Sequence, residues 1–141
     1  MTLVVDASVA FCWFTREAGS AQANALIRSK EELIAPSLLC VEVANTAWKK
    51  LRNKEMTADQ ALAATVEIRR FILEIAPVET LTRDALDIAS QINHSLYDCV
   101  YLALARRREA RFITLDDVFL RALADTTFEK MALHLADWRP A

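Results

Sequence analysis

Four acidic side chains stand out because each interrupts or borders an apolar stretch of the chain. Asp6 stops the run "LVV", Glu42 lies inside "LLCVEVA", Asp98 opens "CVYLALA" and Asp116 follows "FIT". Carboxylates are almost never fully buried unless something pairs with them. If the four converge, their like charges raise one another's pKa and oppose folding. A cluster of this kind persists when it binds a hard divalent cation, and Mg²⁺ or Mn²⁺ prefers carboxylate and water oxygens.

A magnesium site built from several aspartates and one glutamate suits phosphodiester chemistry. The metal lowers the pKa of a bound water, orients it and offsets the charge that develops on phosphorus. Ser8 and Thr114 lie two residues from Asp6 and Asp116, so their hydroxyls could hold a metal-bound water or a carboxylate. The same hydroxyls could equally well close Ser/Thr-type turns.

Zinc is disfavoured because histidine and cysteine are absent from fitting positions. The two histidines are His94 and His134, and Cys12, Cys40 and Cys99 are odd in number and widely spaced. No pair of cysteines has zinc-ligand or CxxC spacing. The cysteines are therefore expected to be small hydrophobic core residues in a reducing compartment.

Three of the four carboxylates also have a simpler, structural interpretation. Asp6 and Asp116 could cap the helices that follow them, and Asp98 follows Ser95 by three residues, in a pattern close to a capping box. Acidic groups at helix N-termini are common because they face the positive end of the helix dipole. Judged singly, each of these three is better explained as structural, and only their combination points to a site.

Glu42 differs because it lies beyond the first turn of a helix that Ser37 is predicted to cap. Its neighbours at i+3, i+4 and i+7 are Asn45, Thr46 and Lys49, which form a polar stripe on an otherwise apolar helix. The stripe could face solvent, or Glu42 could pair with Lys49. Considered alone, this helix supports a solvated stripe and a functional site about equally.

The elements that must position these residues are short apolar strands that alternate with helices. This pattern predicts an α/β domain with a short, mainly parallel sheet, in which ligands bind beyond the carboxyl ends of the strands. "TADQ" has the form of a capping box that opens a helix. Strands are expected at 2–5, 32–36, 73–78, 110–114 and, at an edge, 131–135; helices are expected at 7–14, 20–29, 38–52, 58–73, 81–93, 97–109 and 117–124.

Size and composition are those of one compact domain covering residues 1–141. A chain of this length buries roughly 70% of its unfolded surface, and 54% of its residues are hydrophobic. The net charge of −2 gives no overall attraction to nucleic acid or to an anionic membrane. No apolar run approaches the roughly 20 residues of a membrane-spanning helix. "MTLVVDASV" does not resemble a signal peptide, so a cytoplasmic location is expected.

Four motifs in order resemble the PIN-domain ribonucleases, and most closely the VapC toxins of toxin–antitoxin pairs. They are "VVDASV", "APSLLCVEVANTAW", "SLYDCVYLALA" and "FITLDD", which together span nearly the whole chain. The resemblance implies a three-layer PIN-like domain and a Mg²⁺- or Mn²⁺-dependent endoribonuclease. Carried over residue by residue, its metal ligands and catalytic residues are Asp6, Glu42, Asp98 and Asp116, with Ser8, Asn45 and Thr114 as supporting polar residues.

The adjacent Asp117 could share or replace the role of Asp116, although the Thr-x-Asp register selects Asp116. The resemblance also implies a homodimer and a small antitoxin whose tail covers the acidic groove. The substrate is expected to be RNA, with tRNA or another structured RNA as candidates. The sequence leaves open the RNA target, the identity of the antitoxin and the number of metal ions.

Basic and aromatic residues give weaker support for RNA binding. A protein that binds RNA needs positive charge along the path of the RNA backbone. A cluster of basic residues ends the helix that contains Glu42, and the basic run 106–108 ends the helix that contains Asp98. We favour the simpler view that these cations complement helix dipoles. Tryptophans can stack on bases, but these are predicted to be core or dimer-interface residues. The residues concerned are Lys49, Lys50, Arg52, Lys54, Arg106, Arg107, Arg108, Trp13, Trp48 and Trp138.

Two other functions compete with the nuclease. "LVVDAS" could present Asp6 as the nucleophile of an aspartyl-phosphate phosphatase, but the second acid expected two residues on is replaced by Ser8. The other alternative is a non-catalytic module on the same fold that binds RNA or protein without cutting it. Metal affinity would discriminate between the module and the nuclease.

Overall fold

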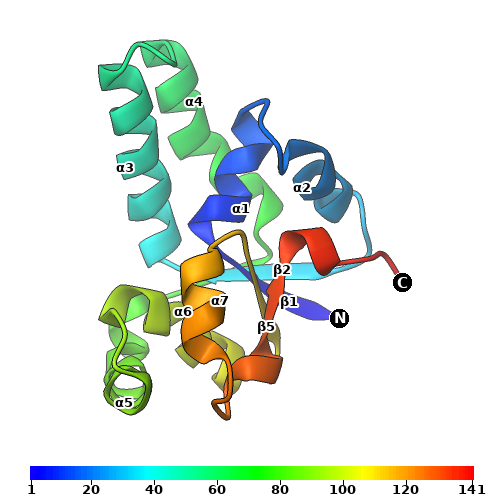
Figure 1. Cartoon of the computed structure of the whole chain (residues 1–141). Coiled ribbons are helices and arrows are strands. Elements are labelled where there is room, and N and C mark those ends of the chain that lie inside the picture. Colours follow the sequence, from blue (N-terminus) through cyan, green and yellow to red (C-terminus); the bar gives the residue numbers. More distant parts are fainter.

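The computed structural model of the chain describes residues 1–141 and centres on a sheet of five parallel strands. The strand order is β3-β2-β1-β4-β5, so the first strand of the chain lies in the middle of the sheet (Figure 1). Every predicted strand is present, including the edge strand near the C-terminus. The bounds are β1 Thr2–Val5, β2 Glu32–Pro36, β3 Glu74–Ala76, β4 Arg111–Thr114 and β5 Ala132–His134.

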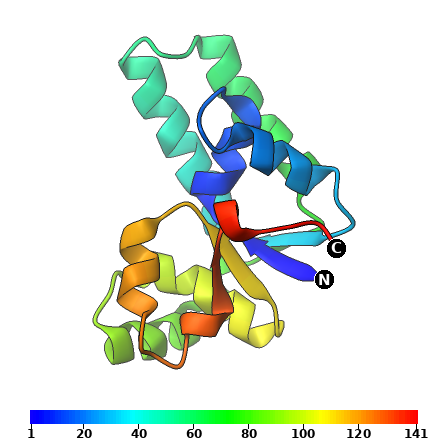
Figure 2. The same ribbon diagram turned by 45° about the vertical axis from the view of Figure 1, so that its right-hand side comes forward.

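The helices cover both faces of the sheet and so complete the expected three layers. Figure 1 shows the first four helices above the sheet and the last three below it, and the turned view in Figure 2 keeps this division. Helix α6 packs on β1, β2 and β4. The bounds are α1 Ala7–Phe11, α2 Ser20–Ile27, α3 Leu38–Arg52, α4 Ala58–Glu67, α5 Thr82–Ile92, α6 Leu96–Arg107 and α7 Asp117–Leu123.

The central strands are buried on both faces, which explains why they read as continuous apolar runs rather than as alternating patterns. Val4 and Val5 are fully buried, and their parallel partners Ile34 and Ile113 are almost completely so. The register pairs Val5 with Ile113, which brings the residue after each strand to the same edge of the sheet. Asp6 therefore begins its loop beside Thr114, and its N–H donates to the Ile113 carbonyl at 3.1 Å.

Two serines that were expected to cap helices do not do so. The Ser37 hydroxyl accepts a hydrogen bond from the backbone N–H of Val78 at 2.9 Å instead, which ties the start of α3 to the segment after β3. The Ser95 side chain makes no cap at α6. By contrast, the predicted capping box of α4 is present: Thr57 and Gln60 bond reciprocally at 3.1 and 2.9 Å.

Several predicted helices are shorter than expected. The segment 7–14 is α1 followed by a 3₁₀ turn at Cys12–Phe14, and α4 ends at Glu67, where a 3₁₀ turn at Ile68–Phe71 leads the chain into β3. That turn places the Phe71 ring edge-on to Trp13, with the ring centroids 5.2 Å apart. No helix in the chain has the length and apolar character needed to cross a membrane.

Two of the cysteines are core residues as expected, whereas the partly buried Cys40 and one tryptophan are not. All three cysteines are free, with Cys12 and Cys99 buried. Trp138 is buried and Trp13 packs against the core, as predicted. Trp48, by contrast, has an exposed fraction of 52% and lies under the Arg52 guanidinium at 4.7 Å. Trp48 is therefore not a core residue, and an interface role for it stays a prediction.

Candidate active site

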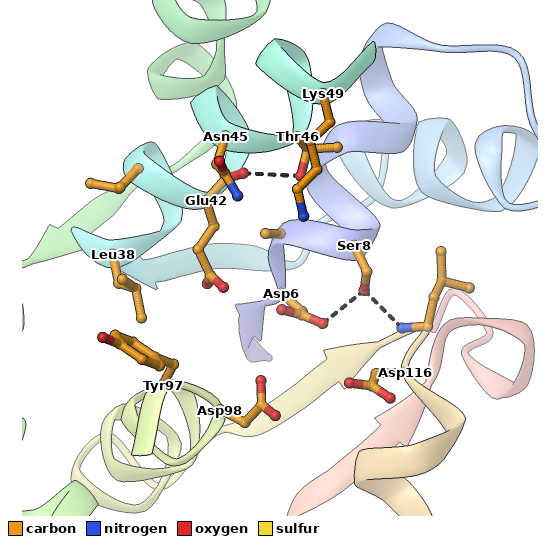
Figure 3. Close-up of a pocket in the computed structure, with 13 residues that line it drawn as sticks. Asp6, Ser8, Leu38, Glu42, Asn45, Thr46, Lys49, Tyr97, Asp98 and Asp116 are labelled. Carbon is orange, nitrogen blue, oxygen red and sulfur yellow. Dashed lines mark hydrogen bonds between the residues drawn. The ribbon is translucent and has the colours of Figure 1, made fainter. Parts of the chain in front are cut away.

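A cavity of about 700 Å³ opens beyond the carboxyl ends of β1 and β4, where ligands bind in parallel sheets. Figure 3 shows its acidic side chains directed into a common space from α3, α6 and the two strand ends. The cavity brings together residues that are up to 110 positions apart in the chain. The predicted residues that line it are Asp6, Ser8, Glu42, Asn45, Asp98 and Asp116.

Asp6 is held at the end of β1 by two hydroxyl groups. Ser8 Oγ and Thr114 Oγ1 both donate to the same oxygen, Asp6 Oδ2, at 2.7 and 2.6 Å. Although Asp6 occupies the N-cap position of α1, its side chain makes no cap hydrogen bond, so the capping interpretation is wrong for this residue. Burial raises the pKa of the Asp6 carboxyl; the Thr114 and Ser8 hydrogen bonds oppose this, and the charge of Asp98 adds to it.

Thr114 combines the two roles that the sequence left open, whereas Ser8 has only one of them. Thr114 Oγ1 accepts from the N–H of Asp116 at 3.0 Å, which closes a local Ser/Thr-type turn, while it orients the Asp6 carboxylate. Ser8 Oγ also orients Asp6, but it accepts from the N–H of Leu115 at 3.1 Å, 107 residues away, and so links the loop after β1 to the loop after β4. Thr114 is fully buried and lies beneath the cavity rather than in its lining.

Asp98 and Asp116 reach the cavity from the first turn of α6 and from the start of α7. Asp98 does not form the capping box expected with Ser95; its Oδ2 lies 2.8 Å from Nε2 of His94 instead. Asp116 does cap α7, since its Oδ1 accepts from the N–H of Phe119 at 3.1 Å, and it lines the cavity as well. For this residue the structural and the functional interpretations are compatible.

Asp117 points away from the site. Its side chain has an exposed fraction of 71%, lies 3.5 Å from Nε2 of His134 and does not line the cavity. The placement favours Asp116 over Asp117 as the acid that follows β4.

Glu42 lies half-buried in the second turn of α3, where its Oε1 accepts a hydrogen bond from the Tyr101 hydroxyl. It forms no ion pair with Lys49. Burial raises the pKa of the Glu42 carboxyl; Tyr101 opposes this by hydrogen bonding, and the charges of Asp6 and Asp98 raise the pKa further.

The polar stripe that follows Glu42 faces the cavity rather than bulk solvent alone. Asn45, Thr46 and Lys49 all line the same wall of the cavity as Glu42. Thr46 also donates its hydroxyl to the Glu42 carbonyl at 3.0 Å, a bond within the helix. Of the two alternatives for this stripe, the site is therefore the better supported.

Most cations that end the two helices are paired and are not free to bind a substrate. Arg106 and Arg107 contact acidic residues of α5, Arg108 contacts Glu74, and Lys50 lies 3.4 Å from Glu55. Lys49 differs because it is exposed, lines the cavity and has no acidic partner within 4.0 Å. The cavity wall thus carries one unpaired positive charge.

The donor set fits a hard cation, although the site is not fully assembled. Four carboxylates line the cavity, whereas no histidine or cysteine does, which favours Mg²⁺ or Mn²⁺ over zinc. The charge of Asp98 raises the pKa of Asp6, and the charges of Asp6 and Asp98 raise the pKa of Glu42, so the cluster gains by binding positive charge. No three of these side chains form a ready-made metal site.

Two residues that contact the carboxylates were missed in the sequence. Tyr101 lies three residues after Asp98, on the same face of α6, and His94 lies four residues before it. The signal for Tyr101 was a lone hydroxyl in the apolar run "CVYLALA", and the i, i+4 spacing from Asp98 was the signal for His94.

A parallel sheet with an acidic cavity at its carboxyl edge places the chain in a recognisable class. The chain belongs to the PIN-domain family, which matches it over residues 3–124. Within that family it is of the VapC type. Over 118 residues it is 32% identical to Ribonuclease VapC3 from Pyrobaculum aerophilum, a match that covers 82% of this chain and 90% of that protein.

Solved structures share the fold at much lower sequence identity. VapC20 from Mycobacterium tuberculosis, described as a sarcin-ricin loop cleaving toxin, has a TM-score of 0.65 at 20% identity, covering 85% of this chain and 94% of its own. A chain of VapBC2 from Rickettsia felis, bound to a promoter DNA fragment, has a TM-score of 0.65 at 10% identity, covering 99% of this chain and all of that chain. These likenesses confirm the predicted three-layer PIN-like fold.

Proposed function

We propose that the chain is a Mg²⁺- or Mn²⁺-dependent endoribonuclease and the toxin of a toxin–antitoxin pair, acting as one domain over residues 1–141. The observation that carries the proposal is the convergence of Asp6, Glu42, Asp98 and Asp116 on one cavity. A relative of the same type is named a ribonuclease, and a structural neighbour is described as a sarcin-ricin loop cleaving toxin.

The residues that line or support the cavity would have different roles in hydrolysis. The four carboxylates would hold the cation, while Ser8 and Thr114 keep Asp6 in one orientation through the bonds to its Oδ2. A bound Mg²⁺ or Mn²⁺ would supply an activated water and stabilise the charge that develops on phosphorus. Asn45, exposed on the wall beside Glu42, would donate its amide to the substrate.

Lys49 would contact the RNA backbone. The cavity is strongly acidic, so an RNA phosphate approaching it needs positive charge in addition to that of the cation. Lys49 projects from the α3 wall into the cavity, two turns from Glu42, and no carboxylate neutralises it (Figure 3). A phosphate held there would lie next to the metal-binding carboxylates.

The remaining expectations concern partners and location. We propose an antitoxin partner because two of the structural neighbours are VapBC proteins. A homodimer, a structured RNA such as tRNA as the substrate and a cytoplasmic location remain proposals drawn from the family resemblance. The second candidate function is a non-catalytic binding module, which the lack of a ready-made metal cluster favours.

Cleavage of RNA with and without metal tests the proposal. The purified protein is incubated with structured RNAs in Mg²⁺, in Mn²⁺ and in EDTA, alongside its Asp98→Asn variant. The expected result is metal-dependent cleavage that the variant loses. The variant keeps the size of the side chain, so its loss reports the charge rather than the packing. Binding of RNA without cleavage in any metal would favour the non-catalytic module instead.

A further inference from the structure

Tyr101 is a buried polar residue that core packing alone does not account for. It lies in α6 with an exposed fraction of 1%, and its ring packs against Phe112 with centroids 5.5 Å apart. A buried phenol hydroxyl needs a hydrogen-bond partner, because leaving it unpaired costs free energy. Its partner is the carboxylate of Glu42, 59 residues away on α3.

Glu42 depends on this one bond. The Tyr101 hydroxyl is the only hydrogen-bond donor that the structure gives to the Glu42 carboxylate, and no cation pairs with it. Meanwhile the charges of Asp6 and Asp98 act against the Glu42 carboxylate. Without a donor, that carboxylate would be free to rotate away from the two aspartates. Figure 3 shows it directed from α3 toward Asp6 and Asp98.

The hydrogen bond also connects the two helices that line the cavity, because Tyr101 lies on α6 and Glu42 lies on α3. Asp98 and Tyr101 are three residues apart, so α6 presents both on one face. Helix α6 therefore supplies one carboxylate directly and orients a second carboxylate that belongs to α3. Since the phenol occupies only Oε1 of Glu42, the other oxygen is available to a cation.

We propose that Tyr101 is a positioning residue that fixes Glu42 for binding the divalent cation. The inference rests on the metal centre of the proposed function and adds a residue to it. The competing explanation is that Tyr101 is a core residue whose hydroxyl merely finds an acceptor. The two explanations differ in what loss of the hydroxyl does to metal affinity.

The test compares Tyr101→Phe with Tyr97→Phe by Mn²⁺ titration calorimetry in the absence of RNA. Tyr101→Phe keeps the ring in the core and removes only the hydroxyl. Tyr97 is the matched control, because it lies one turn earlier on α6, is 64% exposed and has no hydrogen bond to Glu42. Loss of a group that orients a metal ligand typically weakens metal binding by about 10–100-fold. We expect about tenfold for Tyr101→Phe and less than about twofold for the control.

A second pair of variants tests whether the effect passes through Glu42. Mn²⁺ affinity is measured for Glu42→Gln with and without Tyr101→Phe. If Tyr101 acts by positioning Glu42, then Tyr101→Phe should add almost nothing once Glu42 has been neutralised. An equal, additive loss in the double variant would overturn the proposal. Unchanged Mn²⁺ affinity in the single Tyr101→Phe variant would also overturn it, even if the melting temperature fell.

If Tyr101→Phe does not fold, Tyr101→Met replaces it, because methionine adapts to irregular core space and also lacks the hydroxyl. The same weakening of Mn²⁺ binding is then expected, and unchanged Mn²⁺ affinity overturns the inference.

RNA cleavage by the wild type separates this inference from the proposed function. If the wild type cleaves RNA and Tyr101→Phe binds Mn²⁺ as tightly as the wild type, only the proposed role of Tyr101 is refuted. If Tyr101→Phe binds Mn²⁺ more weakly but the wild type does not cleave RNA, only the nuclease assignment is refuted. A wild-type protein that binds no Mn²⁺ overturns the inference.

Discussion

Replacing Asp6 by Asn should stabilise the metal-free protein at neutral pH. The two hydroxyl hydrogen bonds both end on Asp6 Oδ2, so an asparagine with its carbonyl oxygen at that position can accept both. Its amide then takes the place of Oδ1. The substitution therefore removes the charge while it keeps the two hydroxyl hydrogen bonds, and it also relieves the repulsion from Asp98.

The magnitude follows from the linkage between pKa and stability. The pKa of Asp6 is raised above 3.8 in the folded state, so between 3.8 and the raised pKa the folded state binds more protons than the unfolded state. Wild-type stability therefore falls as the pH rises through that window, and it stays lower at neutral pH. Each unit by which folding raises the pKa of Asp6 lowers the free energy of unfolding at neutral pH by about 1.4 kcal/mol. For a domain of this size, 1 kcal/mol changes the melting temperature by about 3–4 °C.

The assay is thermal unfolding in EDTA between pH 5 and pH 8, with Asp125→Asn as the control. Asp125 is exposed, does not line the cavity and has a left-handed backbone that asparagine tolerates. We expect the advantage of Asp6→Asn over the wild type to grow with pH and to reach a melting-temperature gain of several degrees. The control should change little. A clear loss of stability at pH 7.5 would mean that Asp6 is mainly a structural acceptor.

Divalent metal should make the wild type more stable than Asp6→Asn, the reverse of the order expected in EDTA. A ligand that binds only the folded state adds about 2.7 kcal/mol when it is present at 100 times its Kd. The wild type should gain this stabilisation in Mn²⁺, whereas Asp6→Asn should gain less because it lacks one anionic ligand. Equal gains in both proteins would show that Asp6 does not contribute to metal binding.

The remaining predictions concern three other positions around the cavity. Glu42→Gln should leave the melting temperature in EDTA unchanged or raise it, because glutamine can still accept from Tyr101; a drop of many degrees would refute this. Lys49→Gln, in the Asp98→Asn background with Mg²⁺, should weaken RNA binding and reduce the slope of log affinity against log salt by about 0.7. The exposed Lys54→Gln control should reduce that slope by less, and equal slopes would exclude a specific phosphate contact. Asp116→Asn should impair RNA cleavage while Asp117→Asn does not, and the reverse result would reassign the role of the two acids.

The sequence was most informative where one residue type violates a strong local pattern. An acid within two residues of the end of a buried apolar strand is conspicuous, and in a parallel sheet all such acids lie at one edge. That is why Asp6 and Asp116 could be placed near each other before the structure was known. The register of β1 and β4 then adds what the sequence lacked, which is that Asp6 begins beside Thr114.

Contacts between distant helices could not be predicted in the same way. The partner of Glu42 depends on how α3 and α6 face each other across the cavity, which no spacing along one helix encodes. The obvious neighbour along α3 was Lys49, and that pairing was wrong. Serine caps failed for a similar reason, since the hydroxyl of Ser37 is used by a segment 41 residues away.

The central claim is that the four carboxylates bind one shared divalent centre. Anomalous diffraction from crystals soaked in Mn²⁺ tests it most directly, with EDTA-treated crystals as the reference. The account predicts a Mn²⁺ peak inside the cavity, bonded to carboxylate oxygens that include those of Asp6 and Asp98. Crystals that show no peak there, or Mn²⁺ only on surface carboxylates outside the cavity, would contradict it.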